Sequence, residues 1–399
     1  MGAAIGRMAG WYARGSGPIP AGRRVAHPAC DSADRAIARR RASRRRTGTA
    51  RPRRHRGTRA RCAPTPDRPH PPPRAVTPAP HRAAVCAGPP PSLLDAMFRL
   101  RFPSRRTALR AALACVAIVA GLLVAAYANG HRRATRVYDV AVRLPAPDPA
   151  LAREGERLLR SRGCSDCHGD DFGGRTLVDE MPVLRFVGSD LTALGDDPAA
   201  VHTRVHLALR HGLDGARRPL LMMPSAEYSG LSLREIEAMS AFLATRAPLS
   251  RALPDSEVGP LGTLLLGAGV IDGLMDAERI DHAAPTPEAP PPVGTLAHGE
   301  HLARLCTGCH RADYAGGPMD HGPPDARPAA NLTPHPDALG RWTDADFVRA
   351  MRTGRTPDGR ALDPRVMPWP AVGRLDDAEL ASLHRYLRTR PPVAPRPPE

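Results

Sequence analysis

The chain has 399 residues, of which 46 are Pro and 36 are Gly, and its formal net charge is +17. This composition excludes one large uniform core and leaves room for two modest domains with unstructured segments. The charge suggests nucleic-acid binding, but residues 1–96 hold 20 Arg against four acidic residues, so nearly all of the basicity lies in that segment.

Residues 1–96 are rich in Arg and Pro and have no apolar periodicity, so we expect a disordered arm. A basic arm can bind nucleic acid or an anionic surface. Alternatively, the segment is not part of the working protein: the chain lacks Lys and uses Arg, Ala, Pro and Gly heavily, as translated GC-rich sequence does. We favour this second interpretation, with the true start at Met97.

Residues 97–130 predict a membrane segment. Several Arg residues precede an uncharged apolar run from Ala111 to Ala128, which is the layout of a secretion signal or a single-span anchor. The length of the run favours an anchor, although Ala126-Tyr127-Ala128 has the pattern of a cleavage site. Because the stronger cationic cluster precedes the run, we expect a single-pass protein of the cytoplasmic membrane whose later residues face the periplasm.

Four cysteines follow the apolar run, in two Cys-x-x-Cys pairs. They are Cys164, Cys167, Cys306 and Cys309. Each pair is followed at once by a histidine, His168 or His310, which a redox dithiol does not require. In zinc ribbons the two pairs lie roughly 15–20 residues apart, far closer than here. Cys-x-x-Cys-His is instead the attachment pattern of c-type haem: two thiols form thioethers and the imidazole binds the iron. We therefore predict two covalently bound haem c groups.

The two motifs belong to a longer repeat. AREGERLL (152–159) aligns with AHGEHLAR (297–304), and LSLREIEAMSAFLATR (231–246) aligns with LDDAELASLHRYLRTR (375–390). We expect two versions of one module. Their predicted bounds are 137–247 and 294–392, joined by a linker over 248–293. We expect its apolar part to pack on a haem domain or between the two domains, and its Pro-rich part to be a spacer.

Helices alone are predicted in each module, because no strand-like alternation of useful length appears. The first helix is capped by Asp148 with Pro149 at its first position. The middle helices follow Asp197-Pro198 and begin at Thr343. The last helices open with the capping boxes Ser232/Glu235 and Asp376/Glu379. The expected fold class is all-α: two tandem cytochrome c-like domains, after a disordered arm and one transmembrane helix.

The sixth iron ligand decides between an electron carrier and an enzyme, because an open position permits chemistry. Both modules contain a Met-Pro pair well after the haem motif. Met223 lies eight residues after Gly215, as Met367 does after Gly359, so we predict Met223 and Met367 as axial ligands opposite His168 and His310. Met222 is assigned to packing, which is also the alternative role for any Met.

The remaining histidines are the alternative ligands, and a bis-His site would need one of them. We expect surface or loop positions for His202, His206, His211, His321 and His335, and a solvated position for His384.

Both modules resemble class I cytochrome c domains, and their arrangement after an anchor resembles the membrane-bound dihaem cytochromes c of bacterial respiratory chains. The resemblance rests on residues 306–310, 331–334, 342–347, 367–369 and 380–386. It implies that the first and last helices of each module cross where a glycine meets an aromatic ring: Gly155 with Phe242, and Gly299 with Tyr386. The first module has no tryptophan equivalent to Trp342.

We therefore expect an electron carrier, not an enzyme, that relays single electrons between redox proteins such as a dehydrogenase, an oxidase or a small cytochrome. Residues 137–399 carry a net charge of −7, which disfavours nucleic acid and suits a cationic redox partner. The alternatives are a peroxidase-like dihaem enzyme, which needs a vacant or detachable iron site, and the cytochrome subunit of a larger dehydrogenase complex.

Overall fold

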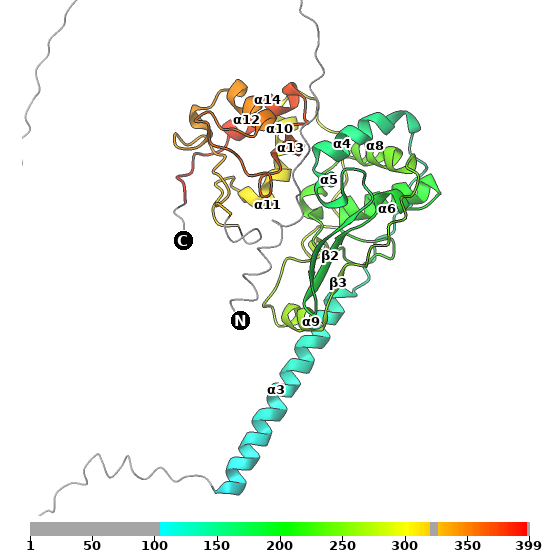
Figure 1. Ribbon diagram of the computed structural model, residues 1–399, viewed down its shortest axis with the longest axis vertical. Coiled ribbons are helices and arrows are strands. Elements are labelled where there is room, and N and C mark those ends of the chain that lie inside the picture. Colours follow the sequence, from blue (N-terminus) through cyan, green and yellow to red (C-terminus); the bar gives the residue numbers. More distant parts are fainter. Residues whose placement is uncertain (1–103, 320–325, 397–399) are drawn as a thin grey trace, which may run out of the picture. The chain divides into compact units, whose positions relative to one another are not determined.

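The computed structural model describes residues 104–319 and 326–396 (Figure 1). The arm over 1–96, the start at Met97 and His321 lie outside the described residues. The described chain begins with α3 (Arg105–Ala134), a helix of 30 residues. Its apolar stretch is long enough to cross a membrane, and none of that stretch is buried by the rest of the described chain. These are the properties of a candidate membrane-spanning helix.

Residues 137–247, called the first segment below, contain mostly short helices. The helices are η1 (Pro149–Leu151), α4 (Ala152–Ser161), α5 (Cys164–His168), η2 (Leu191–Ala193), α6 (Pro198–His211), α7 (Ser225–Tyr228) and α8 (Leu233–Ala244), and the strands are β1 (Arg175–Glu180) and β2 (Leu184–Gly188). The predicted caps are confirmed: the Asp148 side chain accepts from the Ala150 N–H, Asp197 accepts from Ala199, and Ser232 and Glu235 form a capping box.

Residues 294–392, called the second segment below, repeat much of this order. Their elements are α10 (Leu296–Ala303), η4 (Arg304–Cys306), α11 (Thr307–His310), η5 (Leu339–Arg341), α12 (Asp344–Thr353), α13 (Trp369–Val372) and α14 (Asp377–Arg388). Capping boxes at Thr343 and Asp376 begin α12 and α14, as the sequence predicts.

The first and last helices of each segment cross at a glycine, and an apolar core lies beside the crossing. A Cβ at Gly155 would overlap the carbonyl oxygen of Ala238, so α4 and α8 touch through their backbones. At the equivalent crossing of α10 and α14, a Cβ at Gly299 would overlap the Ser382 carbonyl and lie 2.7 Å from the Tyr386 Cβ. The predicted pairing of Gly299 with Tyr386 is confirmed.

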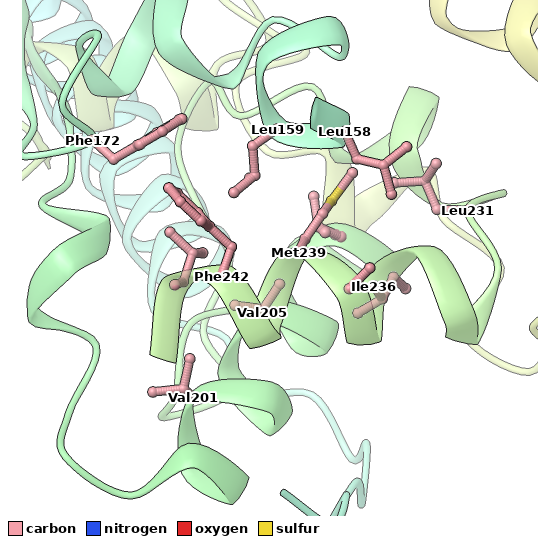
Figure 2. Close-up of a cluster of buried hydrophobic side chains, with 12 residues drawn as sticks. Leu158, Leu159, Phe172, Val201, Val205, Leu231, Ile236, Met239 and Phe242 are labelled. Carbon is pink, nitrogen blue, oxygen red and sulfur yellow. The ribbon is translucent and has the colours of Figure 1, made fainter. Parts of the chain in front are cut away.

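The first crossing has the same backbone contact, because the atoms nearest a Cβ at Gly155 belong to Ala238 and Met239, and the pairing of Gly155 with Phe242 stays a prediction. Phe242 lies in the adjoining core with Leu158, Leu159 and Met239 (Figure 2). A separate core in the second segment contains residues such as Leu302, Phe347, Leu380 and Tyr386.

The fold is mostly helical, as predicted, but it is not all-α. β1, β2 and β3 (Glu257–Val258) form a small antiparallel sheet in the order β1-β2-β3. β1 pairs with β2 from Arg175↔Gly188 to Glu180↔Leu184, with an irregularity between Thr176 and Val178. The strands are short, and this irregularity breaks the alternation of side chains, which is why the sequence pattern does not predict them.

The connection over 248–293 is folded onto its neighbours. Its apolar part forms α9 (Pro260–Gly267), which lies beside the end of α3 (Figure 1). η3 (Asp276–Glu278) follows. The Pro-rich part is hydrogen-bonded to the start of α8, because the N–H of Leu233 donates to Pro287 O at 2.8 Å and that of Arg234 to Glu288 O at 3.1 Å. It is therefore not a free spacer.

Candidate haem sites

The first Cys-x-x-Cys-His motif forms α5, which Gly163 introduces with φ +80°. The ring nitrogen Nδ1 of His168 lies 2.8 Å from the carbonyl oxygen of Ser189. A Cβ at Gly188 would overlap the Cys167 carbonyl oxygen, so the end of β2 lies directly against the motif's backbone. This close approach places the Ser189 carbonyl beside the imidazole.

The second motif has the same geometry. It spans η4 and α11, and Nδ1 of His310 lies 2.7 Å from the carbonyl oxygen of Ala330. The loop that follows each histidine also closes alike: the N–H of Gly174 donates to His168 O at 2.8 Å, and that of Gly316 to His310 O at 3.1 Å.

These contacts fix which nitrogen of each imidazole is available to bind a metal ion. A carbonyl oxygen can only accept, so Nδ1 of His168 and of His310 carries the proton, and Nε2 of a neutral ring keeps its lone pair. Burial lowers the pKa of both histidines, against the opposite effect of the carbonyl hydrogen bond. The result is a neutral, oriented ring, which is the form that binds a metal ion.

Cys164, Cys306 and Cys309 lack the lowered pKa of redox-active thiols. None of the four motif cysteines forms a disulfide. Burial raises the pKa of Cys164 and of Cys306 to about 12, and it also raises the pKa of Cys309. Redox-active thiols need a lowered pKa, because the thiolate is the reactive form. Within the described ranges, no group of three or more His, Cys, Asp or Glu side chains is arranged to hold a metal ion directly.

Met223 and Met367 occupy equivalent turns. In each, the residue two positions later donates its N–H to the methionine carbonyl at 2.7 Å, and a one-turn helix, α7 or α13, follows the proline. Met223 packs against the same core as Cys164, and Met367 against the same core as Cys306. Each segment therefore gathers its thiol and its methionine around one core.

Met222 differs from Met223 in the way expected of a packing residue. Its φ is +54°, its N–H donates to Leu274 O at 2.7 Å, and its side chain packs with Leu184 and Leu266 in a cluster beside α9.

An aromatic pair in each segment was missed from the sequence. Phe172 packs edge-on against Phe242 with ring centroids 5.7 Å apart, and Tyr314 packs edge-on against Tyr386 at 6.1 Å. Both Phe172 and Tyr314 have positive φ, and the backbone carbonyl of each accepts a hydrogen bond at 2.8 Å, from the N–H of Leu191 and of Leu332 respectively. The available signal was an aromatic residue four positions after each motif histidine.

Several expectations for the other histidines were wrong. His202, His206 and His211 are buried and not on a surface, because the connection folds over α6: Nδ1 of His211 lies 3.1 Å from Nδ1 of His282. His384 is fully buried, not solvated, and its ring stacks on Phe347 with Nδ1 2.7 Å from Asp344 Oδ1.

His335 lies in a loop, as expected, and its Nδ1 accepts from the N–H of Asp337.

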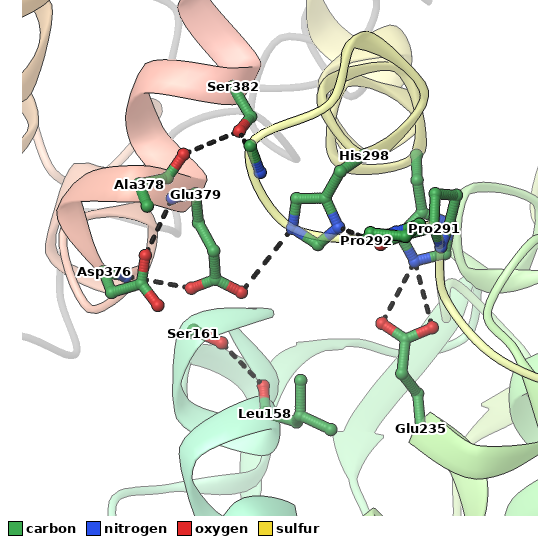
Figure 3. A network of polar contacts seen from close by, with 12 residues as sticks. Leu158, Ser161, Glu235, Pro291, Pro292, His298, Asp376, Ala378, Glu379 and Ser382 are labelled. Carbon is green, nitrogen blue, oxygen red and sulfur yellow. Dashed lines mark hydrogen bonds and ion pairs between the residues drawn. The ribbon is translucent and has the colours of Figure 1, made fainter.

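Two buried glutamates form a polar network around α4, α8, α10 and α14 (Figure 3). Glu379 caps α14 and accepts a hydrogen bond from Arg157 at 2.8 Å. Glu235 caps α8 and contacts Arg162 at 3.2 Å and His301 at 3.0 Å. Burial alone would raise the pKa of each carboxyl, but the surrounding donors and cations lower both to about 2.

Residues 296–391 match the family model described as Cytochrome c. The chain contains a cytochrome c domain. Such a domain implies covalently bound haem c, and the residues present suit that group: each motif offers two thiols, one of which packs against the core, and its histidine keeps Nε2 available. The prediction of haem c as a cofactor is thus confirmed for the second segment.

Curated relatives include cytochrome subunits of dehydrogenases. A nicotinate dehydrogenase subunit of Pseudomonas putida is 35% identical over 150 residues, covering 34% of this chain and 12% of that protein. The cytochrome c subunit of alcohol dehydrogenase (quinone) of Gluconobacter oxydans is 35% identical over 98 residues, covering 23% and 20%. The gluconate 2-dehydrogenase cytochrome c subunit of Pantoea cypripedii is 26% identical over 272 residues, covering 60% and 59%. The chain spans less than two thirds of each relative.

Proposed function

We propose that this chain is a dihaem c-type cytochrome that relays single electrons on the outer side of the cytoplasmic membrane, to which α3 anchors it. Cys164, Cys167, Cys306 and Cys309 attach the two haems. His168 and Met223 bind the first iron, and His310 and Met367 bind the second. When bound, haem c supplies an iron centre that gains and loses one electron.

The observation that carries this proposal is the repeated geometry of the two motifs. In each, a backbone carbonyl holds the Nδ1 proton, so that Nε2 keeps its lone pair for the iron. Cys164 and Met223 border one core, and Cys306 and Met367 border the other. With the haem bound, the thioether sulfur of Met223 or Met367 would raise the reduction potential and would leave no iron position for bond chemistry.

The first experiment counts the haems. Haem and protein are quantified in the purified full-length chain, and we expect two haems per chain. Replacing Cys164 and Cys167 by Ser removes one haem, and replacing Cys306 and Cys309 removes the other. Cys115→Ser is the matched control, because Cys115 lies on α3 and outside both motifs. An unchanged haem content after the first pair of substitutions contradicts the dihaem assignment.

The second experiment tests the ligands and separates a carrier from an enzyme. Met223→Ala and Met367→Ala should each abolish the methionine-to-iron charge-transfer band of one haem and lower its potential, whereas Met222→Ala should preserve both. A high-spin ferric spectrum in the unaltered protein would instead favour a peroxidase-like enzyme, because it reports an open iron position.

The relatives support a dehydrogenase as the electron donor, since two of the three are named as dehydrogenase cytochrome c subunits. We propose that this chain takes electrons from a dehydrogenase and passes them to an oxidase or a small cytochrome. The net charge of −7 over residues 137–399 favours a cationic partner surface. Co-purification from detergent-solubilised membranes, followed by reduction of both haems on adding the dehydrogenase substrate, tests this assignment.

A further inference from the structure

The apolar helix α9 packs tightly against the last turns of α3. A Cβ at Gly130 would overlap the carbonyl oxygen of Thr263, and a Cβ at Gly267 would overlap that of Ala126. The two backbones therefore touch, as packed helices do in membranes where small residues meet.

Side chains of α3 also satisfy the end of α9. Asn129 Nδ2 donates to Gly267 O at 3.0 Å, and Arg133 Nη1 donates to Leu266 O at 3.0 Å. Carbonyls at a helix end have no partner within the helix, and leaving them unpaired is costly away from water. Arg133 also forms ion pairs with Asp272 at 2.7 Å and Glu278 at 2.6 Å, which fix the residues after α9.

The contact spans the end of the apolar run of α3 and the turn that follows it. A groove of about 360 Å³ lies beside this contact and is lined by Leu123, Val124, Tyr127, Ala128 and Leu264. At 1.5 Å per residue, its deepest lining residue lies about 8 Å below the end of the run. Helices that lie in a membrane interface bury their apolar face roughly 5–10 Å deep, so this depth suits α9.

The outer face of α9 is apolar and open. Leu261 is 44% exposed, and Val270, just after the helix, is 57% exposed. α9 has no charged residue. This face continues the exposed apolar surface of α3, so the same apolar surroundings suit both surfaces.

We propose that α9 is an interfacial membrane helix: its outer face inserts into the outer leaflet beside α3, and lipid acyl chains fill the groove beside their contact. This inference rests on the proposed anchoring role of α3 and adds a second, non-spanning contact with the bilayer.

The insertion has a consequence for the first haem motif. The N–H of Gly259 donates to Val183 O at 2.9 Å, and that of Leu261 to Pro182 O at 3.1 Å, so α9 holds the turn between β1 and β2. β2 then runs from Leu184 to Gly188, whose backbone contacts the motif. At about 3.3 Å per residue, β2 sets the motif roughly 13 Å beyond that turn. α9 and β2 together fix the motif's height above the membrane.

The test uses the full-length haem-loaded chain in phospholipid vesicles that contain a lipid with a diazirine in its acyl chain. After irradiation and proteolysis, mass spectrometry locates the label. We expect label in α3 and in residues 260–271, and none in residues 286–296, which contain the equally exposed and apolar Val293 and Leu296. Label in α3 without label in 260–271 overturns this inference while the anchor stands. Label in neither overturns both.

A matched pair of variants sharpens the result. Leu261→Glu places a charge on the outer face at an exposed position, so folding is preserved and the haem spectra should not change. We expect at least a fivefold loss of label in residues 260–271, with labelling of α3 retained. Val293→Glu, at a position that is 49% exposed and outside α9, should leave both signals unchanged. Unchanged labelling of 260–271 in Leu261→Glu contradicts the insertion.

Discussion

Glu235 offers the sharpest test of the buried polar network. It is 5% exposed, it caps α8 through the Ser232 N–H, and it neutralises Arg162, whose side chain is 2% exposed. Glu235→Gln keeps the size and one acceptor but leaves the cation buried without its counter-charge. Breaking a buried pair in this way costs about 3–5 kcal/mol.

The pKa of Glu235 gives the same magnitude and its pH dependence. The pKa falls from 4.5 to about 2 on folding, because His301 and Arg162 outweigh the effect of burial. At 1.36 kcal/mol per unit this is a contribution of about 3 kcal/mol, present above the unfolded pKa and lost as pH falls through the folded one. The difference between Glu235→Gln and the parent should therefore shrink from about 3 kcal/mol at pH 7 to about 1.4 kcal/mol at pH 3.

Guanidinium unfolding of the detergent-solubilised haem-loaded chain, followed by far-ultraviolet and Soret circular dichroism at both pH values, measures this difference. Glu300→Gln is the matched control, because it removes an exposed carboxylate from α10. The electrostatic explanation would be refuted if both variants lost the same free energy of unfolding. It would also be refuted if Glu235→Gln lost the same free energy of unfolding at pH 7 and at pH 3.

Two further predictions concern packing and acid stability. Gly299→Val places side-chain atoms where the Ser382 carbonyl lies, so α10 and α14 must separate and the yield of haem-loaded second segment should collapse. Gly121→Ala is the control and should not change this yield, because the space around its Cβ position is open. The haem-to-protein ratio measures the effect of both substitutions. Burial, aided by His202 and Arg210, lowers the pKa of His206, which also neighbours His211, to about 4, so this ring lowers the free energy of unfolding as pH falls from 6.5 towards 4. In denaturant titrations, His206→Phe should reduce this loss of stability at acid pH. An unchanged dependence of the unfolding free energy on pH would contradict the prediction.

The sequence was informative wherever a function needs residues at short, fixed spacing. The haem motifs and the helix caps are of this kind, because thioether attachment and capping are local in the chain. The carbonyl partners of His168 and His310 were not predictable, since each lies about twenty residues away in a loop whose side chains carry no signal. The burial of His211 also depends on a distant partner, His282, which a connection without periodicity brings to α6.

The small sheet escaped prediction for a different reason. β3 has only two residues, and it pairs with β2 from far along the chain, Leu184 with Val258 and Arg185 with Glu257. No local pattern of that length separates a strand from a loop. Its role becomes visible only through contacts: β2 joins the turn held by α9 to the backbone of the first haem motif.

The first segment lies outside the residues matched to the cytochrome c family, and its side chains depart from those of the second. What the two share is mainly backbone geometry. Each has a carbonyl on the motif imidazole, a left-handed aromatic residue four positions later, and a methionine whose carbonyl accepts a hydrogen bond at the start of a one-turn helix. Backbone hydrogen bonds tolerate many side chains, so such geometry can persist where the sequence no longer matches. A haem needs an oriented imidazole more than it needs particular neighbours, and the first segment has one in His168, with Met223 as the proposed second ligand. This is the physical reason to expect a second haem there, and counting haems after removal of Cys164 and Cys167 decides it.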